Sequence, residues 1–126
     1  MFKKLFGSKA PKEEKLLPWK QLTNAKQLDT IKELSKIKTQ VIFKHSTRCG
    51  ISSMVMNQFT NAYNLDANLD LYYLDLLSFR EVSNEVGYQF QVIHQSPQLL
   101  VIKNGVVVVH ASHSDINDID LSTYII

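Results

Sequence analysis

The sequence predicts an α/β fold in which a mixed central sheet is covered by helices on both faces. Apolar, strand-like runs alternate with amphipathic helical patterns along most of the 126 residues, in the order β-α-β-α-β-α-β-β-α. Asn104-Gly105 separates the last two β-branched runs and predicts an antiparallel hairpin that closes the sheet. One buried strand also leads directly into Cys49, the only cysteine in the chain.

The first half of the chain predicts two strands and the helix between them. A short extended segment is expected at residues 19–22, and residues 41–43 have the apolar run of a buried strand. Asn24 followed by Gln27 is typical of a helix start. The apolar positions expected to line one face of this helix are Leu28, Ile31, Leu34 and Ile37.

The second half predicts three helices and three strands. A helix is expected over residues 51–63, and strands over residues 69–74, 99–102 and 106–109. Ser78 and Glu81 suggest a capping box, opening a helix that buries Phe79, Val82 and Val86. A last short helix is expected at residues 116–126. The apolar positions at helical spacing in the second helix are Ile51, Met54, Val55, Phe59, Ala62 and Tyr63.

This element order is that of the thioredoxin fold, and we expect one such domain at residues 18–126. Residues 1–17 form a separate basic arm, since the first 20 residues hold six lysines and two glutamates, whereas the rest is net acidic. The net charge of +2 therefore gives no basic surface for nucleic acid. The arm mixes lysines with bulky apolar residues, so membrane-surface contact is an alternative to the favoured solvated arm.

The cysteine and histidine content further restricts which class of protein this chain can belong to. One cysteine permits no internal disulfide, and four scattered histidines match no zinc-ligand spacing, so we expect no metal site. The sequence has neither a signal peptide pattern nor an apolar run of the roughly 20 residues needed to span a membrane. We therefore expect a cytoplasmic protein.

Cys49 is the candidate nucleophile. An ordinary thiol is mostly protonated at neutral pH, but a helix N-terminus and the adjacent Arg48 both favour the thiolate. Ser52 stands where a Cys-x-x-Cys pair would place its second thiol, and its hydroxyl could donate to the thiolate. His45 is at most a minor tuner of the thiol. The alternative is an inert, buried cysteine, which is commoner among proteins in general.

Two further segments are expected at the same end of the sheet. Ser96-Pro97 precedes a strand, and a cis peptide bond there would expose the backbone of Ser96 to an extended ligand, although trans is the commoner form. Ser114 and Asp115 offer a hydroxyl and a carboxylate to a polar ligand. One of them could equally cap the last helix, and the two roles are compatible.

Four separated motifs resemble the YtxJ family of monothiol bacilliredoxins, proteins of the bacillithiol system. They are residues 43–52, which include Thr47 and Gly50, then residues 96–98, 102–105 and 111–116. The resemblance runs from about Trp19 to the C-terminus and leaves the basic arm outside. Family members often have Pro or Ser at the position of Gly50.

The resemblance implies a thiol-disulfide oxidoreductase that removes bacillithiol from mixed disulfides on client proteins. Cys49 would attack the bacillithiol sulfur, supported by its neighbours Thr47, Arg48, Gly50 and Ser52. Ser96 and Pro97 would align the thiol, and Ser114 and Asp115 would bind its polar groups. Bacillithiol would be a co-substrate with no tightly bound cofactor, and a low-molecular-weight thiol or a reductase would recycle Cys49.

Two alternatives stay open. Cys49-Gly50-Ile51-Ser52 also resembles the Cys-Gly-Phe-Ser motif of monothiol glutaredoxins, which carry iron–sulfur clusters between two subunits. Ile51 in place of the aromatic residue, with Thr47-Arg48 before the cysteine, argues against that class. A non-catalytic thioredoxin-like adaptor ranks third.

Overall fold

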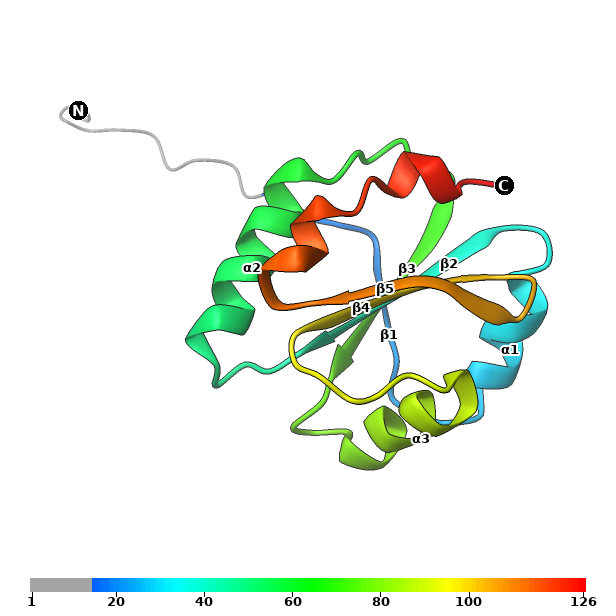
Figure 1. Ribbon diagram of the computed structural model, residues 1–126, viewed down its shortest axis with the longest axis horizontal. Helices are drawn as coiled ribbons and strands as arrows, with labels where there is room; N and C mark the ends of the chain where they lie inside the picture. Colours follow the sequence, from blue (N-terminus) through cyan, green and yellow to red (C-terminus); the bar gives the residue numbers. More distant parts are fainter. Residues whose placement is uncertain (1–14) are drawn as a thin grey trace, which may run out of the picture.

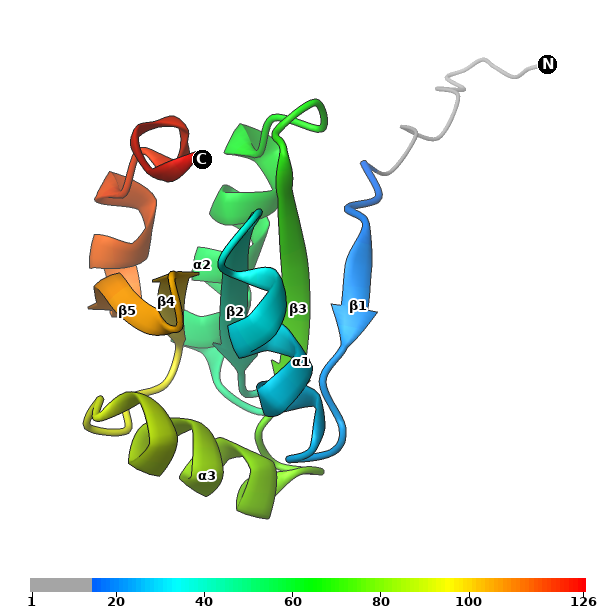
Figure 2. The same ribbon diagram turned by 90° about the vertical axis from the view of Figure 1, so that its right-hand side faces the viewer.

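The computed structural model describes residues 15–126, which form a five-stranded sheet with the strand order β1-β3-β2-β4-β5 (Figures 1 and 2). Strands β1, β3 and β2 are parallel, whereas β4 runs antiparallel to β2 and β5 antiparallel to β4. The predicted mixed sheet with an antiparallel closing hairpin is therefore confirmed. The strands are β1 (Trp19–Gln21), β2 (Thr39–His45), β3 (Leu69–Asp75), β4 (Gln98–Lys103) and β5 (Val106–Ser112).

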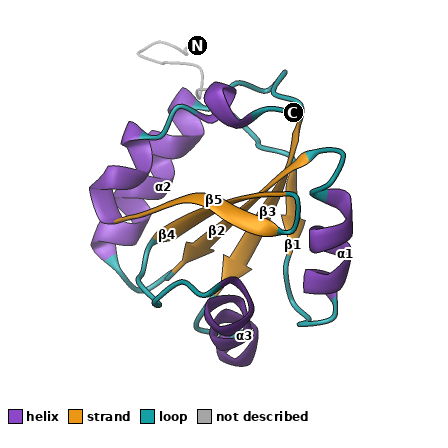
Figure 3. Ribbon diagram, turned by 45° about the vertical axis from the view of Figure 1, so that its right-hand side comes forward, coloured by secondary structure: helices purple, strands orange, loops and turns teal. Residues whose placement is uncertain are grey.

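Helices cover both faces of this sheet, as the sequence predicts. Figure 3 shows α2 on one side of the strands and α1 and α3 on the other. Two short 3-10 helices at the C-terminal end, η1 and η2, pack with α2 around the second of two buried clusters. The helices are α1 (Gln27–Leu34), α2 (Gly50–Ala62), α3 (Arg80–Phe90), η1 (His113–Asp118) and η2 (Leu121–Tyr124).

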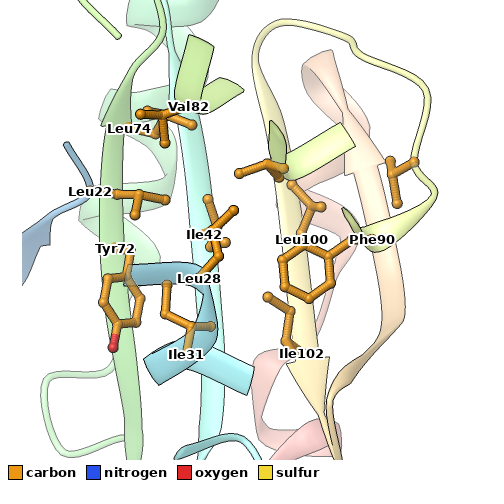
Figure 4. Close-up of a cluster of buried hydrophobic side chains, with 12 residues drawn as sticks. Leu22, Leu28, Ile31, Ile42, Tyr72, Leu74, Val82, Phe90, Leu100 and Ile102 are labelled. Atoms are coloured by element: carbon orange, nitrogen blue, oxygen red, sulfur yellow. The ribbon is translucent and has the colours of Figure 1, made fainter. Parts of the chain in front are cut away.

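Strand β2 lies at the centre of the sheet, and all seven of its residues are buried. Because side chains alternate along a strand, Ile42 enters the core under α1 and α3, whereas Val41 and Phe43 enter the core under α2. Figure 4 shows the first of these cores. Its labelled members are Leu22, Leu28, Ile31, Ile42, Tyr72, Leu74, Val82, Phe90, Leu100 and Ile102.

The β4–β5 connection is a two-residue hairpin turn. Asn104 and Gly105 both have positive φ, 52° and 78°, which is the conformation that Asn-Gly favours between antiparallel strands. Ser35, just after α1, binds the turn through two hydrogen bonds. Its carbonyl accepts from Asn104 N at 2.9 Å, and its hydroxyl accepts from Gly105 N at 2.8 Å. The sequence pattern thus predicts the turn, and the fold adds an anchor from a distant segment.

Strand β5 contains a bulge opposite the Val101–Ile102 step of β4. The pairing passes from Val101 with Val109 to Ile102 with Val107, so Val108 is an extra residue. One extra residue exchanges the faces on either side of it. Accordingly, Val107 packs against the core under α1 and α3, whereas Val109 packs against the core under α2.

Two predicted helix ends are wrong. Helix α1 ends at Leu34, so Ile37 lies beyond it and is 74% exposed. The predicted helix at residues 116–126 is replaced by η1 and η2. Between them, the Asp120 carboxylate accepts from the backbone N–H of Ser122 at 3.1 Å and from its hydroxyl at 2.6 Å. Such local bonds compete with helical backbone bonds and divide the segment.

The capping box proposed for Ser78 and Glu81 is also wrong. The N-cap of α3 is Phe79, which makes no side-chain cap bond. In the turn before the helix, the carboxylate of Asp75 accepts from the N–H groups of Leu77 and Ser78 and from the Ser78 hydroxyl. The Ser78 hydroxyl, which was expected to cap α3, thus bonds to Asp75 in the turn that precedes the helix. Before α1, Gln27 Oε1 accepts from Asn24 N at 3.0 Å, the contact expected of a helix start at Asn24, but the helix itself begins at Gln27 with Lys26 at the N-cap position.

The buried face of α2 differs from the predicted one. Ser52, Val55 and Phe59 are buried in the helix, whereas Ile51 and Met54 are 54% and 49% exposed. The helix begins at Gly50, so its first turn presents these two apolar side chains to solvent directly after Cys49. Periodicity alone predicted the helix correctly but misplaced its inner face at this end.

The basic arm lies largely outside the described residues. Of residues 1–17, only Lys15, Leu16 and Leu17 are described; Lys15 Nζ donates to the carbonyl groups of Asn61 and Tyr63 at the end of α2. Leu17 packs against the core under α2. Among the helices of residues 15–126, none has the length and apolar character that crossing a membrane requires.

Replacing Gly105 with Ala should lower the free energy of unfolding by about 1–2 kcal/mol, since a Cβ at φ 78° is strained although nothing lies within 4 Å of it. Gly50→Ala is the matched control, because its Cβ position is equally open and its φ is not positive. The control should keep or slightly raise stability. Urea unfolding of both variants checks this, and equal losses would contradict the role assigned to the positive φ.

Candidate active site

Cys49 occupies the N-cap position of α2, four residues after the end of β2. Its backbone is extended, with φ −107° and ψ 121°, and its carbonyl accepts from Ser53 N at 3.0 Å to open the helix. The first N–H groups of a helix have no partner within it, and the first turn of α2 carries no acidic residue. The positive end of the helix is therefore directed at a partly exposed sulfur-bearing residue.

The backbone beside Cys49 is open to approach. Gly50 is exposed, and a Cβ built on it would meet nothing within 4 Å. Thr47 and Arg48 lie in the turn before the cysteine, and both are exposed. These three residues are thus exposed next to Cys49 in the chain, and their supporting roles stay predictions.

Ser52 is buried beneath this turn, and its hydroxyl has partners other than the sulfur. It accepts from Ser46 N at 3.1 Å and lies 2.7 Å from His45 Nδ1. Because Ser52 is fully buried, both contacts are shielded from water. The expected hydrogen bond from Ser52 to the Cys49 thiolate is not among these contacts, and the hydroxyl instead ties α2 to the end of β2.

His45 contributes to the same internal contact. Its ring is buried 5.7 Å from the ring of Tyr73, and its Nδ1 faces Ser52. Burial lowers the pKa of His45, and the charge of Asp75, its neighbour in register on β3, opposes that shift. A neutral ring accepts the Ser52 proton at Nδ1, so His45 acts on the first turn of α2 rather than on the sulfur.

Ser96 and Pro97 lie where β4 begins, and the peptide bond between them is cis. Pro97 is buried, and its carbonyl accepts from His113 N at 3.0 Å. The Ser96 hydroxyl oxygen is buried without a hydrogen-bond partner among the described residues. The cis geometry that the sequence left open is therefore present, next to the start of η1.

Ser114 and Asp115 are exposed residues inside the first turn of η1. The N-cap position is Ser112, without a side-chain cap bond, so the capping alternative for Ser114 or Asp115 is wrong. The chain enters η1 through His113, whose φ is 56°. The hydroxyl of Ser114 and the carboxylate of Asp115 therefore lie at the surface and make no capping bond.

Sheet register places these segments at one end of the molecule. Lys44 of β2 pairs with Gln98 of β4, which in turn pairs with Ser112 of β5. The end of β2, the start of β4 and the end of β5 are therefore neighbours, and Cys49, Ser96-Pro97 and Ser114-Asp115 each lie just beyond one of them. Figure 1 shows η1 lying beside α2, and Asn117 of η1 donates to Gln58 Oε1 of α2 at 2.9 Å.

Two residues at this end, Lys44 and His94, were not predicted from the sequence. The predicted strand stopped at Phe43, so Lys44 fell in a loop, whereas in the structure it is a fully buried residue of β2. His94 lies in the segment between α3 and β4 and contacts it. The signal that could have revealed Lys44 is its position directly after the apolar run of residues 41–43, which a strand buried on both faces can continue. No signal in the sequence pointed to His94.

Replacing Ser52 with Ala should lower the free energy of unfolding by about 1–3 kcal/mol, because Ser46 N–H and His45 Nδ1 lose their buried partner. Ser53→Ala is the control: Ser53 is the exposed neighbour on the same helix, and its replacement should change stability by less than about 0.5 kcal/mol. Urea unfolding measures both, and equal stabilities of the two variants would contradict the assigned contacts.

Solved structures similar to this chain share the thioredoxin fold. A protein assigned as an oxidoreductase with a thioredoxin fold is 30% identical, with a TM-score of 0.70 over 82% of this chain and 89% of that one. Malassezia sympodialis thioredoxin is 19% identical, with a TM-score of 0.63 over 90% of each chain. Reduced Schistosoma mansoni thioredoxin pre-protein is 20% identical, with a TM-score of 0.57 over 78% of this chain and 88% of that one.

The latter two resemblances establish the fold alone, and the predicted thioredoxin-like architecture is thus confirmed. A family model described as "Monothiol bacilliredoxin BrxC" matches residues 20–121, which include Cys49, Ser96-Pro97 and Ser114-Asp115. Family and fold together identify a thiol redox protein. Because the match spans most of its length, the chain belongs to the monothiol bacilliredoxin BrxC family.

Proposed function

We propose that this protein removes bacillithiol from mixed disulfides on client proteins by thiol–disulfide exchange at Cys49. The observation that carries the proposal is the position of the chain's single cysteine, partly exposed at the N-cap of a 13-residue helix. A helix N-terminus favours the thiolate, which is the form that attacks a disulfide. The family match supports the choice of bacillithiol as the thiol transferred.

The exchange balances without an oxidant or a reductant. The Cys49 thiolate attacks the bacillithiol sulfur, a new S–S bond forms between them, and the S–S bond to the client breaks. The client sulfur leaves as a thiolate and takes a proton from solvent. Free bacillithiol, or the thiol of a reductase, then attacks the adduct and releases Cys49 with the formation of a second disulfide.

The adduct on Cys49 persists until that second thiol arrives, because the chain holds no other cysteine. Ser52, at the place of a resolving thiol, is occupied by its contacts to His45 and Ser46. A single-thiol protein of this kind transfers the small thiol rather than forming an internal disulfide. Its partners are therefore modified client proteins on one side and a recycling thiol on the other.

The flanking segments have roles consistent with this chemistry. The backbone of Ser96, beside the cis bond to Pro97, would align the disulfide with the sulfur of Cys49. Ser114 and Asp115 are exposed in the first turn of η1 and would bind polar groups of bacillithiol. Ile51 and Met54, exposed after the cysteine, would contact an apolar part of the client.

Intact-mass analysis tests the transfer directly. Reduced protein mixed with a bacillithiolated client should gain one bacillithiol mass and release the client thiol, while Cys49→Ser should gain none. A glutathionylated client run in parallel measures selectivity for the small thiol. Absence of any adduct on the wild-type protein would overturn the proposal, and brown, iron-containing protein from anaerobic purification would point to the cluster-carrier class.

Introducing a second thiol at Ser52 should divert the reaction. Ser52→Cys places a thiol in the first turn of α2, three residues after Cys49, where it can displace bacillithiol and form an internal disulfide. The bacillithiol adduct should fall to a minor fraction of its wild-type yield. Ser53→Cys is the matched control, since Ser53 is exposed rather than buried under the turn, and it should keep the adduct. Full adduct yield in Ser52→Cys would contradict the assigned geometry.

A further inference from the structure

Lys44 is a fully buried ammonium group on the central strand. Its Nζ donates to the carbonyl of Ser83 on α3 at 3.2 Å and lies 3.3 Å from Nδ1 of His94. None of the three ion pairs within residues 15–126 includes it. Burial lowers the pKa of Lys44 to about 8, so the group still carries its charge at neutral pH.

An uncompensated buried charge is costly for stability. Lys44 adjoins Ile42 and Leu100, which belong to an apolar core, so an unbranched apolar side chain would suit the same position. Because none of the ion pairs within the described residues includes Lys44, no carboxylate there offsets the free-energy cost of burying its ammonium group. This points to a role for Lys44 other than stabilising the fold.

The segment that Lys44 contacts, residues 91–97, joins α3 to β4 and ends at the cis Ser96–Pro97 bond. Near the start of this segment, Val92 N donates to the carbonyl of Gly87 at 3.1 Å. The two backbones are close there, since a Cβ on Gly87 would lie 3.0 Å from the Val92 carbonyl oxygen. Gln98 Nε2 donates to Ile93 O at 2.9 Å. Lys44 adds the contact to His94, two residues before Ser96.

Two buried acceptors beside this segment lack partners among the described residues. They are Ser96 Oγ and Gln98 Oε1. Gln98 is paired with Lys44 across β2 and β4, so their side chains share one face of the sheet. A lysine has three N–H donors, and Lys44 uses two of them on Ser83 and His94. The third N–H group of Lys44 is therefore left over on the same face of the sheet as Gln98 Oε1, which has no donor among the described residues.

We propose that Lys44 is a positioning residue that holds residues 91–97 through His94 and thereby sets the place of Ser96-Pro97 opposite Cys49. Its remaining N–H serves Gln98 Oε1, at the first residue after the proline, through one buried water. This inference rests on the proposed thiol transfer, since it concerns how a disulfide is aligned there. Lys44 does not touch the reacting sulfur atoms.

The contact requires a charged Lys44 and a neutral His94, because Nδ1 can accept a hydrogen bond from the ammonium group only when Nδ1 carries no proton. Burial, the charge of Lys44 and the charge of Arg80 on α3 all lower the pKa of His94 and preserve this state at neutral pH. On acidification to a pH below that at which an ordinary histidine titrates, protonation of His94 sets two positive charges against each other. Above a pH of about 8, Lys44 loses the charge that strengthens its bonds.

The test compares two rates on Cys49: adduct formation from a bacillithiolated client, which needs alignment, and alkylation by iodoacetamide, which does not. Lys44→Met should lower the ratio of the first rate to the second at least about tenfold, as small misplacements in a site do. Its midpoint of urea unfolding at pH 7 should equal or exceed that of the wild type. His94→Leu should lower the ratio similarly, and the double variant no further.

Lys103→Met, at the other end of β4, is the matched control and should leave the ratio unchanged. The wild-type ratio should fall at acidic pH, and this fall should be absent in Lys44→Met. An unchanged ratio in Lys44→Met would overturn the positioning role, as would additive losses in the double variant. A wild-type protein that is alkylated but takes no adduct would instead overturn the proposed function, and this inference with it.

Discussion

The whole structure depends on the burial of β2 on both faces, which obliges each of its polar side chains to find a partner inside the protein. Thr39 donates to the carbonyl of Tyr124 at 2.6 Å, and Gln40 bonds to Tyr72 and Asp70 on β3. Lys44 bonds toward α3, and His45 toward α2. One strand therefore links the C-terminal segment, its neighbouring strand and two helices that cover opposite faces of the sheet.

The same constraint places Cys49, the candidate nucleophile. Because β2 is held along its length, the turn that follows it is fixed, and Cys49 meets the free N–H groups of α2 without a charged residue in the first turn to oppose them. The His45–Ser52 contact joins strand and helix beneath the turn. The proposed chemistry of the single cysteine therefore rests on its placement by the backbone at the N-cap of α2.

Features set by local sequence were predictable, and those set by tertiary partners were not. Hydrophobic periodicity gave the order of strands and helices, and Asn104-Gly105 gave the turn, because both act over a few residues. The partners of Ser52 lie only six and seven residues away, but they depend on how the turn between β2 and α2 folds, and the burial of Lys44 depends on Ser83, which is 39 residues away. The division of the last helix turned on Asp120, whose local bonds outweigh an apolar pattern of helical spacing.

The bulge at Val108 also bears on how the sheet meets other chains. Strand β5 is an outer strand, and a regular outer strand offers a row of free backbone groups on which another strand can add. An extra residue interrupts the spacing of that row and increases the local twist. The opposite edge, β1, is three residues long. Both edges of the sheet are thus poor templates for intermolecular strand pairing, which protects the protein against aggregation through its sheet edges.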